Sequence, residues 1–141
     1  MSDLVYGDPR IDAWVATKLD IRQWPQSYSI ANVKDGFILG ATVLHNYYPE
    51  TGVVEMTSAS DSPRWMSRKM LNAVFEYAFT TLGCQLVVLR VSQINARMVN
   101  IAEGLGFSGY LIPRLRGRDE AEWIFTLTDD DWRSSKYRRL S

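Results

Sequence analysis

The sequence predicts a mixed α/β (α+β) domain, in which a mostly antiparallel sheet contains one parallel strand–helix–strand crossover. Three observations support this fold class. Turn sequences divide residues 28–59 into three strand-like segments. A long amphipathic segment follows, and after it comes the apolar run 86–91. A strand that is apolar along its length is typical of burial on both faces beside a parallel neighbour.

The first elements are a short strand and a helix. Asp8 is a good N-cap and Pro9 suits the first helical position, so we expect the helix to begin here. Trp24-Pro25 is predicted to end this unit. The inward face of the helix carries apolar residues at helical spacing, namely Ile11, Trp14, Val15 and Leu19.

An antiparallel meander is predicted next, with strands over residues 28–33, 37–47 and 53–59. Lys34-Asp35-Gly36 supplies the first tight turn, and Pro49-Glu50-Thr51-Gly52 supplies the second. Short turns of this kind join strands that lie side by side, so the three segments are expected to be neighbours in one sheet.

The longest helix is expected to start with Ser62 as its N-cap and Pro63 as its first helical residue, and to stop at Gly83. One face of this segment is apolar throughout, which indicates a helix packed on the sheet. The residues on that face are Met66, Met70, Leu71, Val74, Phe75, Ala78 and Leu82.

A second helix, a closing hairpin and a polar tail complete the chain. Asn95 begins the helix, and Gly104 and Gly106 close it. The hairpin and the tail are predicted over residues 108–115 with 121–127, and over residues 129–141. We expect the tail to be a flexible, solvated end. Residues 1–141 together are expected to form a single domain.

The composition is that of an ordinary globular domain, since 141 residues include sixteen basic and sixteen acidic ones. This balance indicates no particular polymer partner. Cys84 is the single cysteine and His45 the single histidine, so we expect neither a disulfide within the chain nor a bound metal. No apolar run is long enough to cross a membrane, and residues 1–4 do not resemble a signal peptide. A cytoplasmic location without membrane contact is therefore expected.

Three cations follow the predicted start of the longest helix, namely Arg64, Arg68 and Lys69. Cations near a helix N-terminus oppose the macrodipole by about 0.3–1 kcal/mol each. A bound anion would reverse the sign of this effect, and a diphosphate fits the description. The alternative is a solvated helix face on which these cations pair with carboxylates. Trp65 would then lie in the core or at its rim.

Three stretches occur with the order and spacing of a known family. They are Ser60-Asp61-Ser62-Pro63-Arg64-Trp65-Met66-Ser67-Arg68 leading to Glu76-Tyr77-Ala78-Phe79, the strand 86–91, and Asn95-Ala96-Arg97 through Gly104-Leu105-Gly106-Phe107. With them, residues 53–107 resemble the GNAT superfamily of N-acetyltransferases, and most of all its ribosomal-protein-acetylating branch and phage-borne relatives. The resemblance implies a GNAT-like fold over most of the chain.

The resemblance also implies acetyl-CoA as the co-substrate and transfer of its acetyl group to an amine of a protein or small molecule, by direct attack on the thioester. Asn95 would lie near the pantetheine or the thioester. Backbone N–H groups of residues 64–68 would hold the pyrophosphate, and the edge of the strand 53–59 would pair with the pantetheine amides. The residues expected to bind acetyl-CoA are Ser58, Arg64, Trp65, Met66, Ser67, Arg68 and Asn95.

The sequence departs from the family pattern at several positions. Two glycines of the family's pyrophosphate loop are replaced here by Pro63 and Trp65, and proline has no N–H to donate. Ala102 stands where many members have a tyrosine general acid, and Met98 where the related branch often has a serine. These departures leave open an alternative function, a catalytically degenerate protein that keeps the GNAT fold for binding or assembly.

An attacking amine must be neutral, and since a lysine-type amine has a pKa of about 10.4, a base is expected to assist. Glu55 is the candidate base, because its strand should face both cofactor and acceptor; a solvated strand glutamate is the alternative. Tyr110 is the candidate proton donor to the departing thiolate, with packing as its alternative. His45 titrates in the useful range, although a lone histidine is often structural. Cys84 is expected in the core.

The end of the chain mixes charges of both signs. Arg133, Lys136, Arg138 and Arg139 would suit a nucleic acid or another partner, but the acidic run 129–131 beside them argues against it. Acetyl-CoA and an amine acceptor are therefore the expected partners, nucleic acid is not, and a homodimer stays open.

Overall fold

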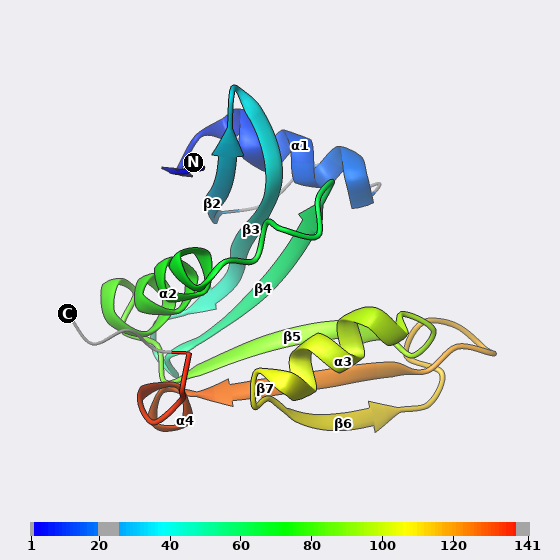
Figure 1. Ribbon diagram of the computed structural model, residues 1–141. Helices are drawn as coiled ribbons and strands as arrows, with labels where there is room; N and C mark the ends of the chain where they lie inside the picture. The colour runs from blue at the N-terminus through cyan, green and yellow to red at the C-terminus, as the bar shows by residue number, and fades with distance from the viewer. Residues whose placement is uncertain (1, 20–25, 138–141) are drawn as a thin grey trace.

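The computed structural model describes residues 2–19 and 26–137 (Figure 1). The predicted end of the first unit at Trp24-Pro25 lies outside the described residues. The elements are β1 (Asp3–Tyr6), α1 (Pro9–Leu19), β2 (Ser27–Lys34), β3 (Phe37–Tyr48), β4 (Val53–Ser60), α2 (Arg68–Glu76), the π-helical turn η1 (Tyr77–Thr81), β5 (Leu86–Ser92), α3 (Ala96–Gly104), β6 (Ser108–Ile112), β7 (Glu122–Thr128) and α4 (Asp129–Arg133). No helix in these ranges is long and apolar enough to cross a membrane.

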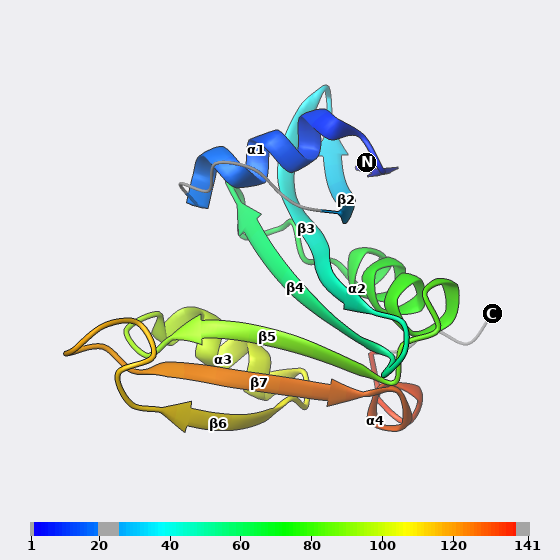
Figure 2. The same cartoon turned by 180° about the vertical axis from the view of Figure 1, so that it is seen from behind.

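Seven strands form one sheet in the order β1-β2-β3-β4-β5-β7-β6. Every neighbouring pair is antiparallel except β4 and β5, which run parallel, so the predicted fold class is confirmed. The parallel pair is short. Its register runs from Val53 opposite Leu86 to Met56 opposite Leu89, and beyond these residues the two strands diverge (Figures 1 and 2).

Helices cover both faces of the sheet. α1 packs on one face, where Ile11 and Val15 contact Val43. α2 and α3 pack on the other, where Phe75 and Ala102 share a core with the inward side chains of β4, β5 and β7. Figure 1 shows α2 and α3 on the viewer's side of the sheet. Figure 2, the view from behind, shows α1 on the viewer's side. Because side chains alternate along a strand, β4 and β5 place one set of residues toward each face.

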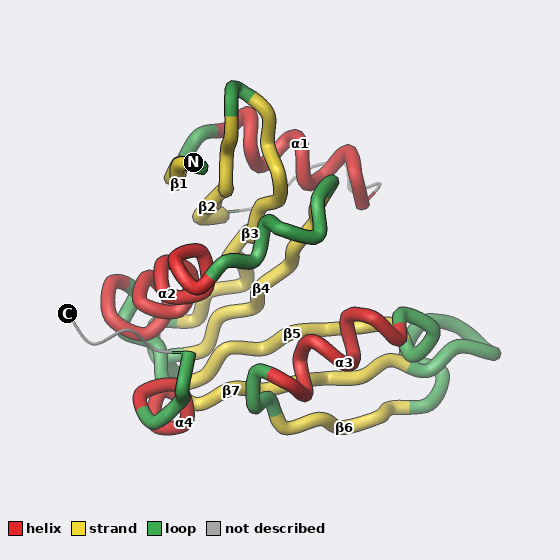
Figure 3. The backbone as a smooth tube through the Cα atoms, in the orientation of Figure 1, coloured by secondary structure: helices red, strands yellow, loops and turns green. Residues whose placement is uncertain are grey.

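The start of the longest helix differs from the prediction. α2 begins at Arg68 with Ser67 as its N-cap, not at Pro63 with Ser62. Residues 61–67 form a loop instead, which Figure 3 shows between β4 and α2. The backbone N–H groups of Asp61 and Ser62 both donate to the Leu39 carbonyl, at 2.9 and 3.1 Å. These bonds hold residues 61 and 62 against β3.

Trp65 fixes the rest of that loop. Its side chain is buried, and a Cβ at Gly40 would overlap its ring, so β3 accommodates the indole only because residue 40 is glycine. The Trp65 carbonyl also accepts a hydrogen bond from Asn32 Nδ2 at 2.8 Å. The core alternative for this tryptophan is therefore what the structure shows.

The expectation of a flexible tail from residue 129 is wrong for residues 129–137. Thr128 Oγ1 caps α4 by accepting from the Asp131 N–H at 3.0 Å. Trp132 is 1% exposed, and its ring centroid lies 4.7 Å from that of Phe75. Asn72 Nδ2 donates to the Tyr137 carbonyl at 2.8 Å. A buried aromatic side chain thus anchors this segment, while Arg138 and Arg139 lie outside the described residues.

Candidate active site

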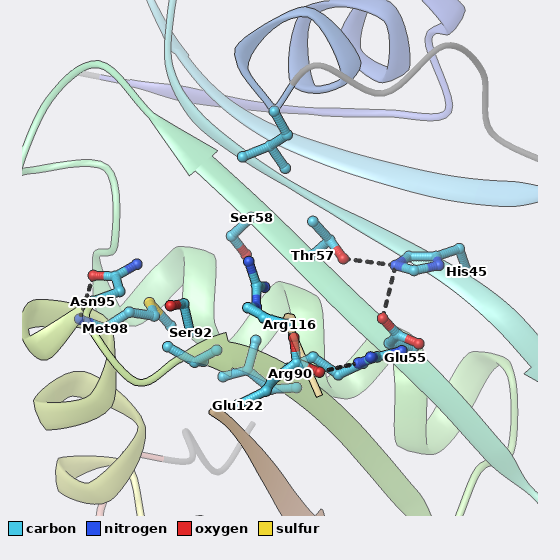
Figure 4. Close-up of a pocket in the computed structure, with 13 residues that line it drawn as sticks. His45, Glu55, Thr57, Ser58, Arg90, Ser92, Asn95, Met98, Arg116 and Glu122 are labelled. Atoms are coloured by element: carbon cyan, nitrogen blue, oxygen red, sulfur yellow. Dashed lines mark hydrogen bonds and ion pairs between the residues drawn. The ribbon is translucent and has the colours of Figure 1, made fainter. Parts of the chain in front are cut away.

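The divergence of β4 and β5 opens a cleft of about 480 Å³ (Figure 4). Leu19 at the end of α1 lines it, and most of its polar lining comes from the sheet face that α1 covers, so we call it the α1-face cleft. The charged or titratable residues that line it are His45, Glu55, Arg90, Arg116 and Glu122. An open, polar space between two strands is a natural place for a small ligand.

A second hollow of about 250 Å³ adjoins this cleft, and we call it the α3 hollow. Ser58, Asn95 and Met98 line both spaces, so the two meet where the strands part. Trp65 and Arg97 are among the other residues that line the α3 hollow. A ligand in one space could therefore reach a ligand in the other between β4 and β5.

The edge of β4 that faces the divergence lacks a strand partner. Pairing with β5 ends at Met56, whereas β4 continues to Ser60. Backbone N–H and C=O groups on that edge need hydrogen-bond partners. An extended ligand with amide groups can bind such an edge as an added strand would. The side chains along this edge include that of Ser58, whose hydroxyl lies 2.8 Å from Thr42 Oγ1.

The N-terminus of α2 lies at the end of the loop that follows β4. Ser67 Oγ accepts from the Met70 N–H at 3.1 Å, which leaves the N–H groups of Arg68 and Lys69 without a partner inside the helix. Within residues 2–19 and 26–137, neither Arg64 nor Arg68 forms an ion pair with a carboxylate. The pairing expected of a solvated face is therefore absent from the described residues, and the arrangement suits an anion.

The other residues expected to bind acetyl-CoA differ in what they can offer. The Trp65 N–H donates to the Ser62 carbonyl at 3.3 Å and its indole is buried, so this residue shapes the α3 hollow rather than reaching into it. Met66 is half-buried in the same loop. Asn95 caps α3 by accepting from the Met98 N–H at 3.2 Å, as its predicted place at the helix start requires.

Glu55 lies in the α1-face cleft beside a buried histidine. Its Oε2 is 3.7 Å from His45 Nε2, and its Oε1 accepts from Asn46 Nδ2 at 3.1 Å. His45 Nε2 also lies 2.7 Å from Thr57 Oγ1. Burial lowers the pKa of His45, and the neighbouring carboxylate of Glu55 offsets this only in part. His45 is therefore neutral at pH 7 and leaves Glu55 as the negative charge on this wall.

The opposite wall carries a cluster that the sequence did not reveal. Glu122 is 2% exposed, and its two carboxylate oxygens accept from Arg90 Nε and Arg116 Nε, both at 2.5 Å. Two guanidinium groups compensate the buried carboxylate, as a buried charge requires. The one signal in the sequence is that Arg90 interrupts the apolar run 86–91.

Two other candidates lie away from this cleft. Tyr110 lies on β6, the outermost strand, is 59% exposed, and is separated from β5 by β7. The structure therefore does not bring it to Glu55, Ser58 and Asn95, which do line one cleft. Cys84 is buried in the core, as predicted, and burial raises the pKa of its thiol.

Comparisons with known proteins bear on the fold and on the family. No curated protein matches the sequence. The spermidine/spermine N-acetyltransferase SpeG of Vibrio cholerae has a similar structure, with a TM-score of 0.78, 13% identity, and coverage of 95% of this chain and 99% of that chain. A dodecameric spermidine N-acetyltransferase structure from Vibrio cholerae gives a TM-score of 0.73 at 14% identity, covering 94% and 98%. These likenesses concern the fold.

The sequence itself matches the family described as "Acetyltransferase (GNAT) domain" over residues 5–108. The match includes β4, the loop after it, β5 and α3, which are the elements that form the two spaces. It confirms the superfamily that residues 53–107 resemble. Because it spans more than half of the chain, the protein belongs to the GNAT acetyltransferase family, whose members transfer an acetyl group from acetyl-CoA to an amine.

Proposed function

We propose that this protein binds acetyl-CoA in the α3 hollow and acetylates an amine that enters from the α1-face cleft. The observation that carries the proposal is the divergence of β4 and β5, which joins the two spaces at Ser58, Asn95 and Met98. A donor on one side of the sheet and an acceptor on the other can meet only at such an opening.

The donor is held largely by backbone groups in this proposal. The pantetheine amides pair with the free edge of β4 after Met56, and the pyrophosphate lies at the N-terminus of α2. Arg64 and Arg68 supply positive charge there, and the N–H groups of Ser67, Arg68 and Lys69 supply donors. Ser58 and Asn95 lie beside the thioester. Met66 and Trp65 shape the wall of the hollow.

Glu55 acts as the base. The neutral amine nitrogen attacks the carbonyl carbon of the thioester, a C–N bond forms, and the C–S bond breaks. Glu55 accepts the proton that the amine loses, directly or through a water molecule. The departing thiolate has a basicity close to that of cysteine, with a pKa of about 8.5, so it can leave and take a proton from water. Tyr110 has no part in this scheme.

Two kinds of acceptor follow from the likenesses. The solved neighbours are spermidine or spermine N-acetyltransferases, which favours a polyamine. The narrower resemblance of residues 53–107 to the ribosomal-protein-acetylating branch and its phage-borne relatives favours a protein amine, modified in the cytoplasm. The charges of the cleft decide between these acceptors, as argued below.

The test is a calorimetric titration with acetyl-CoA, followed by an assay of CoA thiol release with a panel of amines. Micromolar binding together with acceptor-dependent thiol release is expected. Arg10→Ala serves as a control, because this exposed arginine pairs with Asp8 at the start of α1, away from both spaces. Absence of acetyl-CoA binding would favour the alternative of a binding or assembly protein that keeps only the fold.

A further inference from the structure

The two walls of the α1-face cleft carry opposite charge. Glu55 is the negative group on the β4 wall, since its neighbour His45 is neutral at pH 7. On the β5–β7 wall, Arg90 and Arg116 share the single carboxylate of Glu122, so one positive charge remains. Figure 4 shows these groups lining one space. A ligand that spans this cleft therefore meets a negative end and a positive end.

The arginines keep most of their donors free for a ligand. Each binds Glu122 through Nε, and no other described residue accepts from their terminal nitrogens. Their side chains are 44% and 42% exposed, whereas the carboxylate between them is buried. A guanidinium has five N–H donors and binds carboxylates in a planar, bidentate manner. Glu122 thus orients two arginines whose outer edges point to the cleft.

Other carboxylates near this wall do not cancel its charge in the cleft. Glu120 Oε2 accepts from the Ser92 hydroxyl at 2.5 Å, and Glu120 is not among the residues that line the space. The register of the sheet gives the spacing of the two backbones at these positions. Glu55 pairs with Val88, and Arg90 lies two residues further along β5, so their α-carbons are at least about 8 Å apart.

We propose that the acceptor is an amine that carries a carboxylate several bonds from its nitrogen. This inference rests on the proposed function, because it assigns the acceptor of the same site. The ammonium form binds beside Glu55 and loses one proton to solvent before its nitrogen attacks, while the carboxylate binds the outer N–H groups of Arg90 and Arg116. A polyamine would instead place a second ammonium group against these arginines, where like charges repel.

The test compares two probes of matched length, 5-aminopentanoate and 1,5-diaminopentane. Their binding is followed by NMR titration of the protein alone, so the result does not depend on acetyl-CoA. We expect the carboxylate probe to bind about tenfold more tightly than the diamine, which is the effect of one charge-assisted hydrogen-bond pair. Alanyl-aspartate amide and alanyl-lysine amide are titrated in the same way. Preferential binding of alanyl-aspartate amide would indicate that a peptide N-terminus with a nearby carboxylate also fits the cleft.

Three variants separate recognition from a structural ion cluster. Arg116→Gln removes one guanidinium group and lowers the preference for the carboxylate probe over the diamine. Arg116→Lys keeps the positive charge and retains part of that preference. Glu122→Gln removes the negative charge between the two arginines and raises the preference for the carboxylate probe. An ion cluster that only holds the loop before β7 predicts equal changes for both probes. Arg10→Gln, distant from the cleft, is the control.

Equal or tighter binding of the diamine, or no measurable binding of either probe, would overturn the inference. Thermal unfolding of each variant shows whether it is folded; if Glu122→Gln does not fold, the two Arg116 variants carry the test. Absence of acetyl-CoA binding by the intact protein would contradict the proposed function. The two probes are titrated without acetyl-CoA, so their comparison could still be interpreted in that case.

Discussion

The two sides of the β4–β5 divergence are built from different groups. On the α3 side, the groups available to a ligand are mainly backbone ones, the free edge of β4 and the first N–H groups of α2. On the α1 side, they are charged side chains that bind one another, Glu55 with His45 and Glu122 with two arginines. Backbone groups are the same for any sequence with this fold, whereas side chains differ from one sequence to another.

This contrast explains how one fold can keep a donor and change its acceptor. In the proposed function, the donor side accommodates Pro63 and Trp65 where the family has glycines. Contacts with Leu39, Gly40 and Asn32 hold the loop, and the N-terminus of α2 is preserved. The acceptor side depends on particular charges at particular positions. Variants on the two sides should therefore have separable effects.

The largest effect is expected on the acceptor side, from Glu55→Gln. Loss of the base should lower kcat/KM by about 10²–10³-fold, within the range of general base catalysis. The affinity for acetyl-CoA should not change, because Glu55 lines only the α1-face cleft. Steady-state thiol release and calorimetry measure the two quantities. Glu50→Gln, in the exposed turn before β4, is the matched control. An unchanged kcat/KM would exclude Glu55 as the base.

The next effect belongs to the donor side and comes from Gly40→Ala. The added methyl group would overlap the Trp65 ring, so the loop before α2 must shift. Such overpacking costs about 1–3 kcal/mol of unfolding free energy, and acetyl-CoA binding should weaken as well. Urea denaturation and calorimetry are the measurements. Gly104→Ala is the control, since a Cβ there meets open space within helix α3. Equal stability of the two variants would contradict the packing role of Gly40.

The features of the fold that could be predicted from the sequence are those that depend on residues close together along the chain. The strand predicted over 53–59 is β4, Val53–Ser60, and the run 86–91 is β5, Leu86–Ser92, because turns and apolar patterns are local signals. The start of α2 was missed because Trp65 is buried against Gly40, on another strand. No local pattern reports that contact.

The candidate site shows the same limit. Asn95 was placed correctly, since an N-cap is a local feature. Arg90 and Glu122 were missed because they are 32 residues apart and meet only through the pairing of β5 with β7. The anchored tail was missed for a similar reason, since the burial of Trp132 depends on Phe75 in α2. The family resemblance implies no role for Arg90 or Glu122, which both line the acceptor side.

A smaller effect is expected from the donor-side cations. Arg64→Ala and Arg68→Ala should each weaken acetyl-CoA binding by about tenfold, the effect of one charge-assisted contact. The affinity for the amine should be unaffected, and the weakening should diminish at high salt, which screens exposed charges. Calorimetry at two salt concentrations measures this. Arg10→Ala is again the control. If both variants bind acetyl-CoA with the wild-type affinity, backbone N–H groups alone bind the pyrophosphate.

The smallest effect concerns the pH dependence of stability and comes from His45. Burial lowers the pKa of His45 in the folded protein below the value of about 6.5 expected for an unfolded chain. The unfolded chain therefore binds more protons than the folded protein at pH values between these two pKa values. Stability contributed by neutral His45 is present above pH 6.5 and is lost as the pH falls toward the folded-state pKa.

His45→Gln removes this titration but keeps a side chain that can hydrogen-bond to Thr57 Oγ1, which lies 2.7 Å from His45 Nε2. The loss of stability between pH 7.5 and pH 5 should thus be smaller in the variant than in wild type. Urea denaturation at the two pH values gives the difference. If both proteins lose equal stability on acidification, His45 is not held neutral, and the charge contrast between the two walls of the α1-face cleft loses one of its supports.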